Sequence, residues 1–171
     1  PRWEAKRKEI EDVVAAIDRN TAAHPEFDLG ESWSGVRSQW QSLKTDIAQL
    51  TPPQSFERHT ALIEMHTRFI VTVSDRSNIT YDPTVAGYQI GILATQRMPM
   101  LTEYLGRLRA WGAVILGQHK ATPDERSRMI SFAGLAEREL AAIAETVGKA
   151  AAAAPAIKAV LDAPQRDAER A

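Results

Sequence analysis

Residues 74–110 read SDRSNITYDPTVAGYQIGILATQRMPMLTEYLGRLRA, and this stretch predicts a long helix. Asp82 and Pro83 mark its start, because an Asp side chain can accept from free backbone N–H groups and Pro at the first helical position has no N–H to leave unbonded. We expect the helix to continue to Gly117, over about 50 Å, with Pro99 as an internal kink. Apolar residues recur on one face: Val85, Tyr88, Ile92, Leu101, Tyr104, Leu108, Trp111 and Ile115.

The remaining segments also read as helices. Amphipathic patterns predict helices over residues 3–23, 32–50 and 54–74. The second of these has a heptad seam made of Trp33, Val36, Trp40, Leu43, Ile47 and Leu50. A capping box at Thr122–Glu125, with Pro123 at the first helical position, begins a fifth helix that Pro155 ends or kinks. A short helix is expected at 156–162, followed by a frayed tail at 164–171. No segment alternates as a strand would, so we predict an all-α, elongated antiparallel bundle with four to five main helices.

Composition narrows the class of protein. The chain has 171 residues, which favours one domain over residues 1–171 with a real core. A net charge of −1 argues against binding to nucleic acid, because contacts to phosphates need a concentrated basic surface. The absence of cysteine excludes disulfides and thiol chemistry. No apolar run reaches the roughly 18 residues of a membrane span. Because the chain starts at Pro1 on a charged helical pattern, we interpret it as a fragment of a longer protein.

Catalysis has little support in the sequence. No local pattern places a Ser beside a His held by a carboxylate. His59 and His66 are seven residues apart, which separates them by about 10 Å along a helix and prevents local chelation of one metal ion. We therefore predict a chain that is not an enzyme, with no cofactor and no metal site. The four histidines are interpreted as structural or interfacial, with pH sensing or metal binding as the alternative.

A polar set around the start of the long helix is the candidate ligand site. Arginines beside tyrosines and an asparagine can recognise a small polar or anionic ligand in an opening between helices. The predicted ligand-binding residues are Arg76, Asn78, Tyr88, Tyr81, Arg97 and Arg68. Tyr88 and Arg97 are nine residues apart and so face different sides of one helix, which ranks Arg97 lower. The alternative is that Asp75 and Asn78 satisfy loop backbone groups while the arginines are solvated.

Two further features have an open interpretation. Trp33, Trp40 and Trp111 are interpreted as core anchors, with a ligand cage as the alternative. Gly87 and Gly91 lie inside the long helix, where they can permit either close packing or ligand access.

The central stretch resembles a segment of the extracytoplasmic helical sensor domains of bacterial transmembrane receptors, both sensor histidine kinases and methyl-accepting chemoreceptors. Those domains often show Asp-x-Ser-Asn-Leu-x-Leu-Asp-Pro, then a Ser-Tyr-Tyr cluster, then Leu-Pro and Leu-Gly-x-x-Arg. The matching residues are Asp75, Ser77, Asn78, Ile79, Asp82, Pro83, Tyr88, Pro99, Leu105, Gly106 and Arg109. Ile79 and Tyr81 stand where leucines are usual, Gly87-Tyr88-Gln89 replaces the cluster, and Met98 precedes Pro99.

The resemblance implies a function. It implies a periplasmic, signal-sensing domain between two transmembrane helices that lie outside this chain, which would be its only link to the membrane. It also implies a homodimer that binds an unidentified small molecule and relays a small helix displacement. We expect the output module to be a two-component histidine kinase, with a chemoreceptor as the alternative. The competing hypothesis from the residues alone is a structural or partner-binding bundle without a small-molecule ligand.

Overall fold

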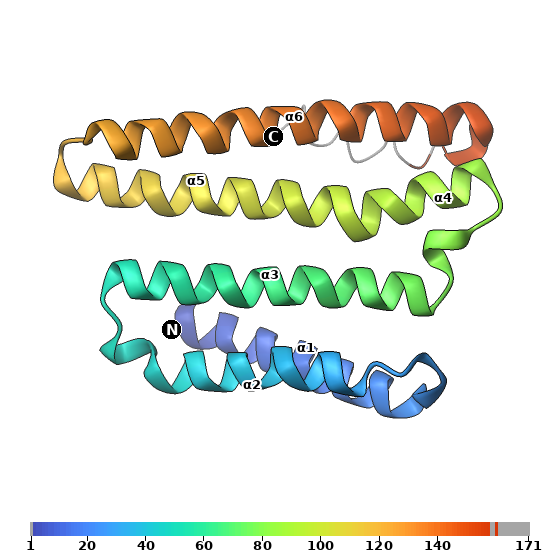
Figure 1. Cartoon of the computed structure of the whole chain (residues 1–171), viewed down its shortest axis with the longest axis horizontal. Coiled ribbons are helices and arrows are strands. Elements are labelled where there is room, and N and C mark those ends of the chain that lie inside the picture. The colour runs from blue at the N-terminus through green and yellow to red at the C-terminus, as the bar shows by residue number, and fades with distance from the viewer. Residues whose placement is uncertain (1, 158–159, 161–171) are drawn as a thin grey trace. The chain divides into compact units, whose positions relative to one another are not determined.

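The computed structural model describes residues 2–157 and residue 160, and every regular element in that part of the chain is helical (Figure 1). The α-helices are α1 (Arg2–Ala23), α2 (Gly30–Asp46), α3 (Pro52–Arg76), α4 (Val85–Ile92), α5 (Met98–Gln118) and α6 (Pro123–Ala153). Short 3₁₀ turns are η1 (Pro25–Phe27), η2 (Ile47–Gln49) and η3 (Ile79–Tyr81), and η4 (Leu93–Arg97) is a π-helix. The predicted all-α fold is therefore confirmed. Most of the short helix expected at 156–162 and all of the tail at 164–171 lie outside the described residues.

The contacts divide the chain into two compact units, with the boundary between Ser77 and Asn78. Unit 1 holds α1, α2 and α3, and unit 2 holds η3 and everything that follows it. Short connections make α2 and α3 antiparallel in unit 1, and they make α5 and α6 antiparallel in unit 2 (Figure 1). That residues 1–171 form one domain stays a prediction.

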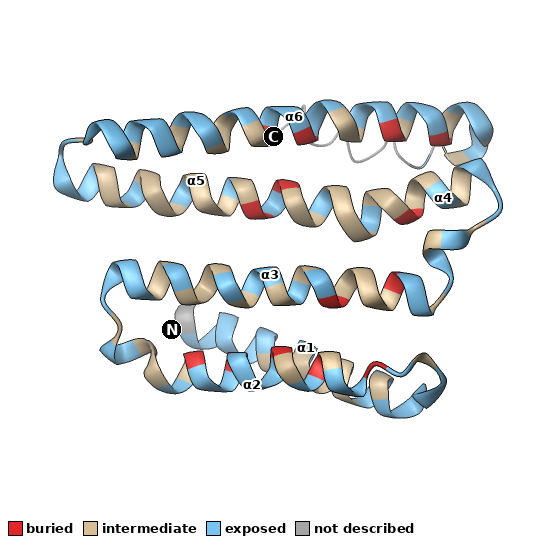
Figure 2. Ribbon diagram, viewed as in Figure 1, coloured by how far each residue is buried: buried red, intermediate tan, exposed pale blue. Residues whose placement is uncertain are grey.

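An aromatic and aliphatic core holds unit 1 together. The four residues of the predicted seam that lie in α2 are buried, with Trp33 5% exposed and Leu43 1% exposed (Figure 2). The last two residues of that seam lie beyond α2 and are only partly buried. Phe69 of α3 packs against Trp33, with their ring centroids 5.3 Å apart. Each such large side chain removes enough apolar surface from water to stabilise the fold by about 2–3 kcal/mol. The interpretation of Trp33 and Trp40 as core anchors is confirmed, since Trp40 is 9% exposed.

Polar contacts that the sequence did not predict join α1 to α2. Two carboxylates of α1, seven residues apart, each accept a hydrogen bond from a Trp indole N–H of α2. The distances are 2.7 Å from Trp33 Nε1 to Asp18 and 3.2 Å from Trp40 Nε1 to Glu11. Lys44 Nζ adds a 2.7 Å contact to the same Glu11 oxygen. Buried indoles need such acceptors, so these pairs fix how α1 lies on α2.

In unit 2 the long helix begins later than predicted. The first helical residue is Val85, and Thr84 is the N-cap, whose side chain accepts from the N–H of Gly87 at 3.0 Å. The predicted capping role of Asp82 is therefore wrong. Asp82 instead accepts from the backbone N–H and the hydroxyl of Thr84, at 2.8 and 2.6 Å. These hydrogen bonds, the one from the hydroxyl foremost, lower the pKa of the Asp82 carboxyl.

Gly87 and Gly91 let η3 and its flanking loop lie directly on α4. A Cβ on Gly87 would overlap the Asp82 carboxylate, and one on Gly91 would come within 2.9 Å of Ile79 Cγ2 and 3.2 Å of the Ile79 carbonyl oxygen. Close packing is therefore the role that the structure supports for both glycines.

Pro99 changes the form of the helix rather than ending it. Because Pro lacks an N–H, it cannot bond to the carbonyl four residues earlier, and the turn before it widens into the π-helix η4. The N–H of Met98 bonds to the carbonyl of Leu93, five residues back. As a result α4, η4 and α5 follow one another without a break, and Arg97 lies in the widened turn.

The start and end of α6 follow the sequence signals. The capping box at Thr122 and Glu125 is present in both directions, with Pro123 in the first turn. The helix ends at Ala153, and Ala154 is extended before Pro155, as the residue before a Pro prefers. None of the described helices is long and apolar enough to cross a membrane.

Candidate ligand-binding groove

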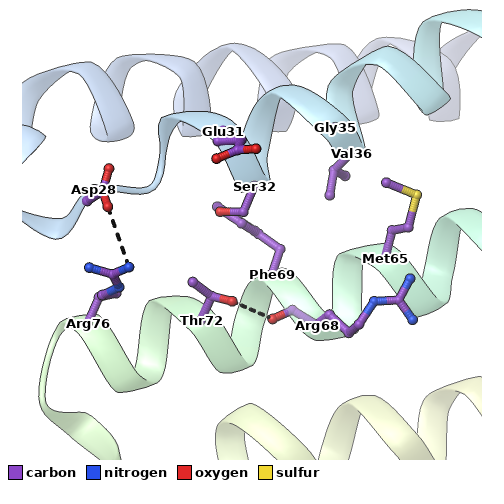
Figure 3. Close-up of a pocket in the computed structure, with 10 residues that line it drawn as sticks. All are labelled: Asp28, Glu31, Ser32, Gly35, Val36, Met65, Arg68, Phe69, Thr72 and Arg76. Carbon is purple, nitrogen blue, oxygen red and sulfur yellow. Dashed lines mark hydrogen bonds and ion pairs between the residues drawn. The ribbon is translucent and has the colours of Figure 1, made fainter.

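An open groove of about 470 Å³ lies in unit 1, between the start of α2 and the last turns of α3. Figure 3 shows the side chains that line it. They are Asp28, Glu31, Ser32, Gly35 and Val36 on one wall and Met65, Arg68, Phe69, Thr72 and Arg76 on the other. The antiparallel α2–α3 hairpin creates this arrangement, because it places the first turns of α2 opposite the last turns of α3.

The floor of the groove is apolar and fixed. Phe69 and Val36 are each 6% exposed and belong to the unit 1 core. Gly35 faces Met65, whose Cε would be 3.5 Å from a Cβ at Gly35. The hydroxyls at the groove are already used, since Thr72 donates to the carbonyl of Arg68 at 3.1 Å and Ser32 donates to that of Leu29 at 3.1 Å. Charged side chains are therefore the groups available to a polar ligand.

Arg68 is the available cation of the groove. It is exposed on α3, and its guanidinium makes no ion pair or hydrogen bond with any residue that the structure describes. In Figure 3 its guanidinium lies toward Met65, away from Arg76. A planar guanidinium beside an apolar floor can bind a small oxyanion through two parallel N–H groups.

Arg76 already has a partner across the groove. Its Nη2 is 3.4 Å from a carboxylate oxygen of Asp28, and the two side chains are 52% and 78% exposed. Asp28 has a left-handed backbone, with φ of 48°, and its N–H bonds to the carbonyl of Pro25. Such exposed pairs contribute only about 0–1 kcal/mol, so this one can be exchanged for another partner.

The structure brings two of the six predicted ligand residues together. Arg68 and Arg76 both line the groove, whereas Asn78, Tyr81, Tyr88 and Arg97 belong to unit 2 and are not among its lining residues. Asn78 has a left-handed backbone at the start of η3, with φ of 61°, which is a turn position that Asn tolerates. Tyr81 is 68% exposed and Tyr88 is 41% exposed. No contact in the described part of the chain joins these two rings.

Arg97 makes a separate polar site within unit 2. Its Nη1 is 3.3 Å from Glu139 of α6, whose side chain is 11% exposed. The Nε of Arg97 is buried and has no hydrogen-bond partner among the described residues. A buried donor without a partner costs free energy, so this N–H can donate to a ligand or to water.

Sequence reasoning missed the acidic wall of the groove. By sequence alone, Asp28 reads only as a loop residue and Glu31 only as a residue near a helix start. The signal that could have found them is the topology, since antiparallel neighbours place the residues just before 32 opposite those just before 76. No group of three or more possible metal ligands occurs in the described part of the chain.

The family model described as nitrate and nitrite sensing matches residues 3–171. No curated protein and no solved structure matches the chain. The match spans nearly the whole chain, and it confirms the resemblance to extracytoplasmic sensor domains of bacterial receptors that was inferred from residues 75–109. It also confirms that the chain is a sensor domain and not an enzyme.

Proposed function

This chain belongs to the nitrate and nitrite sensing family of extracytoplasmic sensor domains, and from that premise we propose that it is the periplasmic sensing part of a transmembrane receptor and binds nitrate or nitrite in the groove of unit 1. The observation that carries the proposal is Arg68, a cation beside an apolar floor that makes no described ion pair. A planar oxyanion and a planar guanidinium fit each other through paired hydrogen bonds.

The spacing of Arg68 and Arg76 on α3 determines how both can contact one bound anion. Arg68 and Arg76 are eight residues apart on one helix, which separates their Cα atoms by about 12 Å along its axis. Both long side chains can reach one small ion only if they turn toward each other, over Thr72. Arg68 then supplies the first contact and Arg76 the second.

The acidic wall favours a singly charged ligand. Asp28 and Glu31 oppose Arg68 and Arg76, so the four side chains sum to a formal charge of zero. A monovalent anion adds one negative charge to this set, whereas sulfate adds two, and repulsion in a partly desolvated groove grows with ligand charge. We expect nitrate and nitrite to bind more tightly than sulfate.

The other four predicted residues, Asn78, Tyr81, Tyr88 and Arg97, lie in unit 2, and of these Arg97 is a second candidate contact for the same ligands. The observation that favours it is the buried Nε of Arg97, which has no described partner. Glu139 argues against it as the main anion site, because a carboxylate 3.3 Å from the same guanidinium repels an anion.

We also propose how the receptor signals, in line with what the resemblance of the central stretch implies. The domain works as a homodimer in a full-length sensor histidine kinase, and binding shifts helices that continue into the membrane. A ligand can move such an equilibrium only by its differential affinity for two states. The other hypothesis is a structural or partner-binding bundle without a small-molecule ligand, which would use exposed apolar side chains such as Leu116, 75% exposed, and Ile130, 74% exposed.

Calorimetric titration of the chain with sodium nitrate, nitrite, sulfate and chloride tests the proposal. Nitrate or nitrite should bind, and Arg68→Ala should weaken that binding at least about tenfold, because a charge-assisted bidentate contact is lost. Arg19→Ala, which removes an exposed arginine of α1, is the matched control and should bind as wild type does. Arg97→Ala separates the two candidate sites. Binding that depends on Arg97 and not on Arg68 would move the site to unit 2, and no binding of any anion would favour the partner-binding alternative.

A further inference from the structure

The two ends of the α2–α3 hairpin are held by ion pairs that differ in distance and in exposure to solvent. At one end, Arg58 Nη1 is 2.6 Å from Asp46, and its Nη2 donates to the Ser42 hydroxyl at 2.8 Å. At the groove end, Arg76 and Asp28 are 3.4 Å apart and both mostly exposed. The groove end is therefore the end whose ion pair is easier to exchange.

We propose that Asp28 competes with the bound anion for Arg76, so that filling the groove releases the α1–α2 loop from α3. This inference rests on the proposed function, because it needs an anion in the groove. Arg76 points at Asp28 in Figure 3 and away from Arg68. Since both arginines reach one small ion only by turning toward each other, Arg76 cannot hold the ion and Asp28 at the same time.

The exchange transmits binding to α1. Asp28 ends the turn η1, which directly follows α1, and its N–H bonds to Pro25 while the N–H of Phe27 bonds to His24. Phe27 packs against the unit 1 core. The Asp28–Arg76 pair is the ion pair that ties this loop to α3 among the described residues. When the anion takes Arg76, Asp28 is left in solvent at little cost, since it is already 78% exposed, and the junction of α1 and α2 gains freedom to move.

The matched pair of variants is Asp28→Asn and Glu31→Gln. Each removes one negative charge from the same wall of the groove, but Glu31 forms no ion pair with the described residues. Asn keeps the tolerance of Asp for the left-handed backbone at position 28, so the substitution does not strain the loop. If the acidic wall acts only by general electrostatic repulsion, the two variants should raise nitrate affinity equally. If Asp28 competes for Arg76, Asp28→Asn should raise nitrate affinity more than Glu31→Gln does.

Nitrate titration of the wild type, both variants, Arg68→Ala and Arg76→Ala is the test. Competition predicts that Asp28→Asn binds nitrate about two- to fivefold more tightly, which is the strength of an exposed ion pair, and that Glu31→Gln gains clearly less. Hydrogen exchange should also show that nitrate speeds exchange of the amides of Phe27 and Asp28 in the wild type. Equal gains in the two variants, or no gain at Asp28→Asn while Arg68→Ala weakens binding, would overturn the competition and leave the groove site standing. Wild-type affinity in both arginine variants would overturn the groove site and this inference with it.

Discussion

Unit 1 and unit 2 bury different kinds of side chain. In unit 1 the buried side chains of the core are aromatic and aliphatic, with Trp33, Val36 and Phe69 at its centre. In unit 2 two glutamates, Glu103 and Glu139, are each only 8% exposed, alongside Leu101 and the small residues Ala136 and Ala150. An apolar core stabilises without regard to partners, whereas a buried carboxylate stabilises only while its partner is in place. We infer that the stability of unit 1 comes mainly from its apolar core, whereas the stability of unit 2 depends on specific polar contacts.

The largest expected effect tests the apolar core of unit 1. Leu43→Ala should lower the free energy of unfolding by about 2–5 kcal/mol, because Leu43 is 1% exposed and its truncation leaves a cavity. The same substitution at Leu116, which is 75% exposed, should change it by less than about 0.5 kcal/mol. Urea denaturation followed by circular dichroism measures both. Similar losses in the two variants would contradict the view that the buried seam stabilises unit 1.

The next effect tests the buried charge of unit 2. Arg97→Met should lower the free energy of unfolding by about 1–3 kcal/mol, because it leaves Glu139 buried without its cation. The double variant Arg97→Met/Glu139→Leu should recover most of that loss, since an apolar pair has no charge to desolvate. Denaturation of the two single variants and the double variant gives the coupling free energy. If the loss of unfolding free energy in the double variant equals the sum of the losses in the two single variants, Arg97 and Glu139 are not energetically coupled.

A smaller effect tests the glycine contacts of unit 2. Gly87→Ala should destabilise the chain by about 1–2 kcal/mol, because the new methyl group displaces Asp82 from its hydrogen bonds to Thr84. Gly134 lies in α6, where a Cβ added to it would meet no atom of the described residues within 4 Å. There the same substitution should stabilise by about 0.5–1 kcal/mol, because Ala is the better helix former. Opposite signs of the shift in thermal midpoint are the expected result, and equal signs would show that Gly87 makes no close contact.

The sequence predicted the helices better than it predicted the contacts between them. Periodicity located the seam of α2, and the capping box located the start of α6, because both signals lie within one helix. It misplaced the start of α4, because Asp82 and Thr84 are both good caps and only the close contact of Asp82 with Gly87 decides between them. The groove could not be predicted without knowing which helices pack side by side, since Asp28 and Arg76 meet only through the α2–α3 hairpin. For the same reason the sequence grouped Arg76 with Tyr88, which belongs to the other unit.

The smallest expected effect concerns the polar contacts of unit 1, which should add little to its apolar core. The pKa of Glu11 lies below its ordinary value of 4.5, chiefly because Lys44 donates a hydrogen bond to it and also because Trp40 does. A carboxyl whose pKa is lowered by folding contributes stability that is complete above 4.5 and is lost as the pH falls through the lowered pKa. Glu11 is partly exposed, so solvent screening limits this contribution to about 0.5–1 kcal/mol.

Glu11→Gln should therefore be less stable than the wild type by that amount at pH 7, and the difference should shrink toward zero as the pH falls below 4.5. Urea denaturation at several pH values measures it. Glu9→Gln is the control, because among the residues that the structure describes Glu9 pairs only with Lys6 on the exposed face of α1, and it should show almost no difference at any pH. A Glu11→Gln difference that stays constant down to low pH would mean that the side chain stabilises α1 by packing and not by its charge. A difference as large as that of Leu43→Ala would break the contrast between the units, because unit 1 would then depend on polar contacts as unit 2 does.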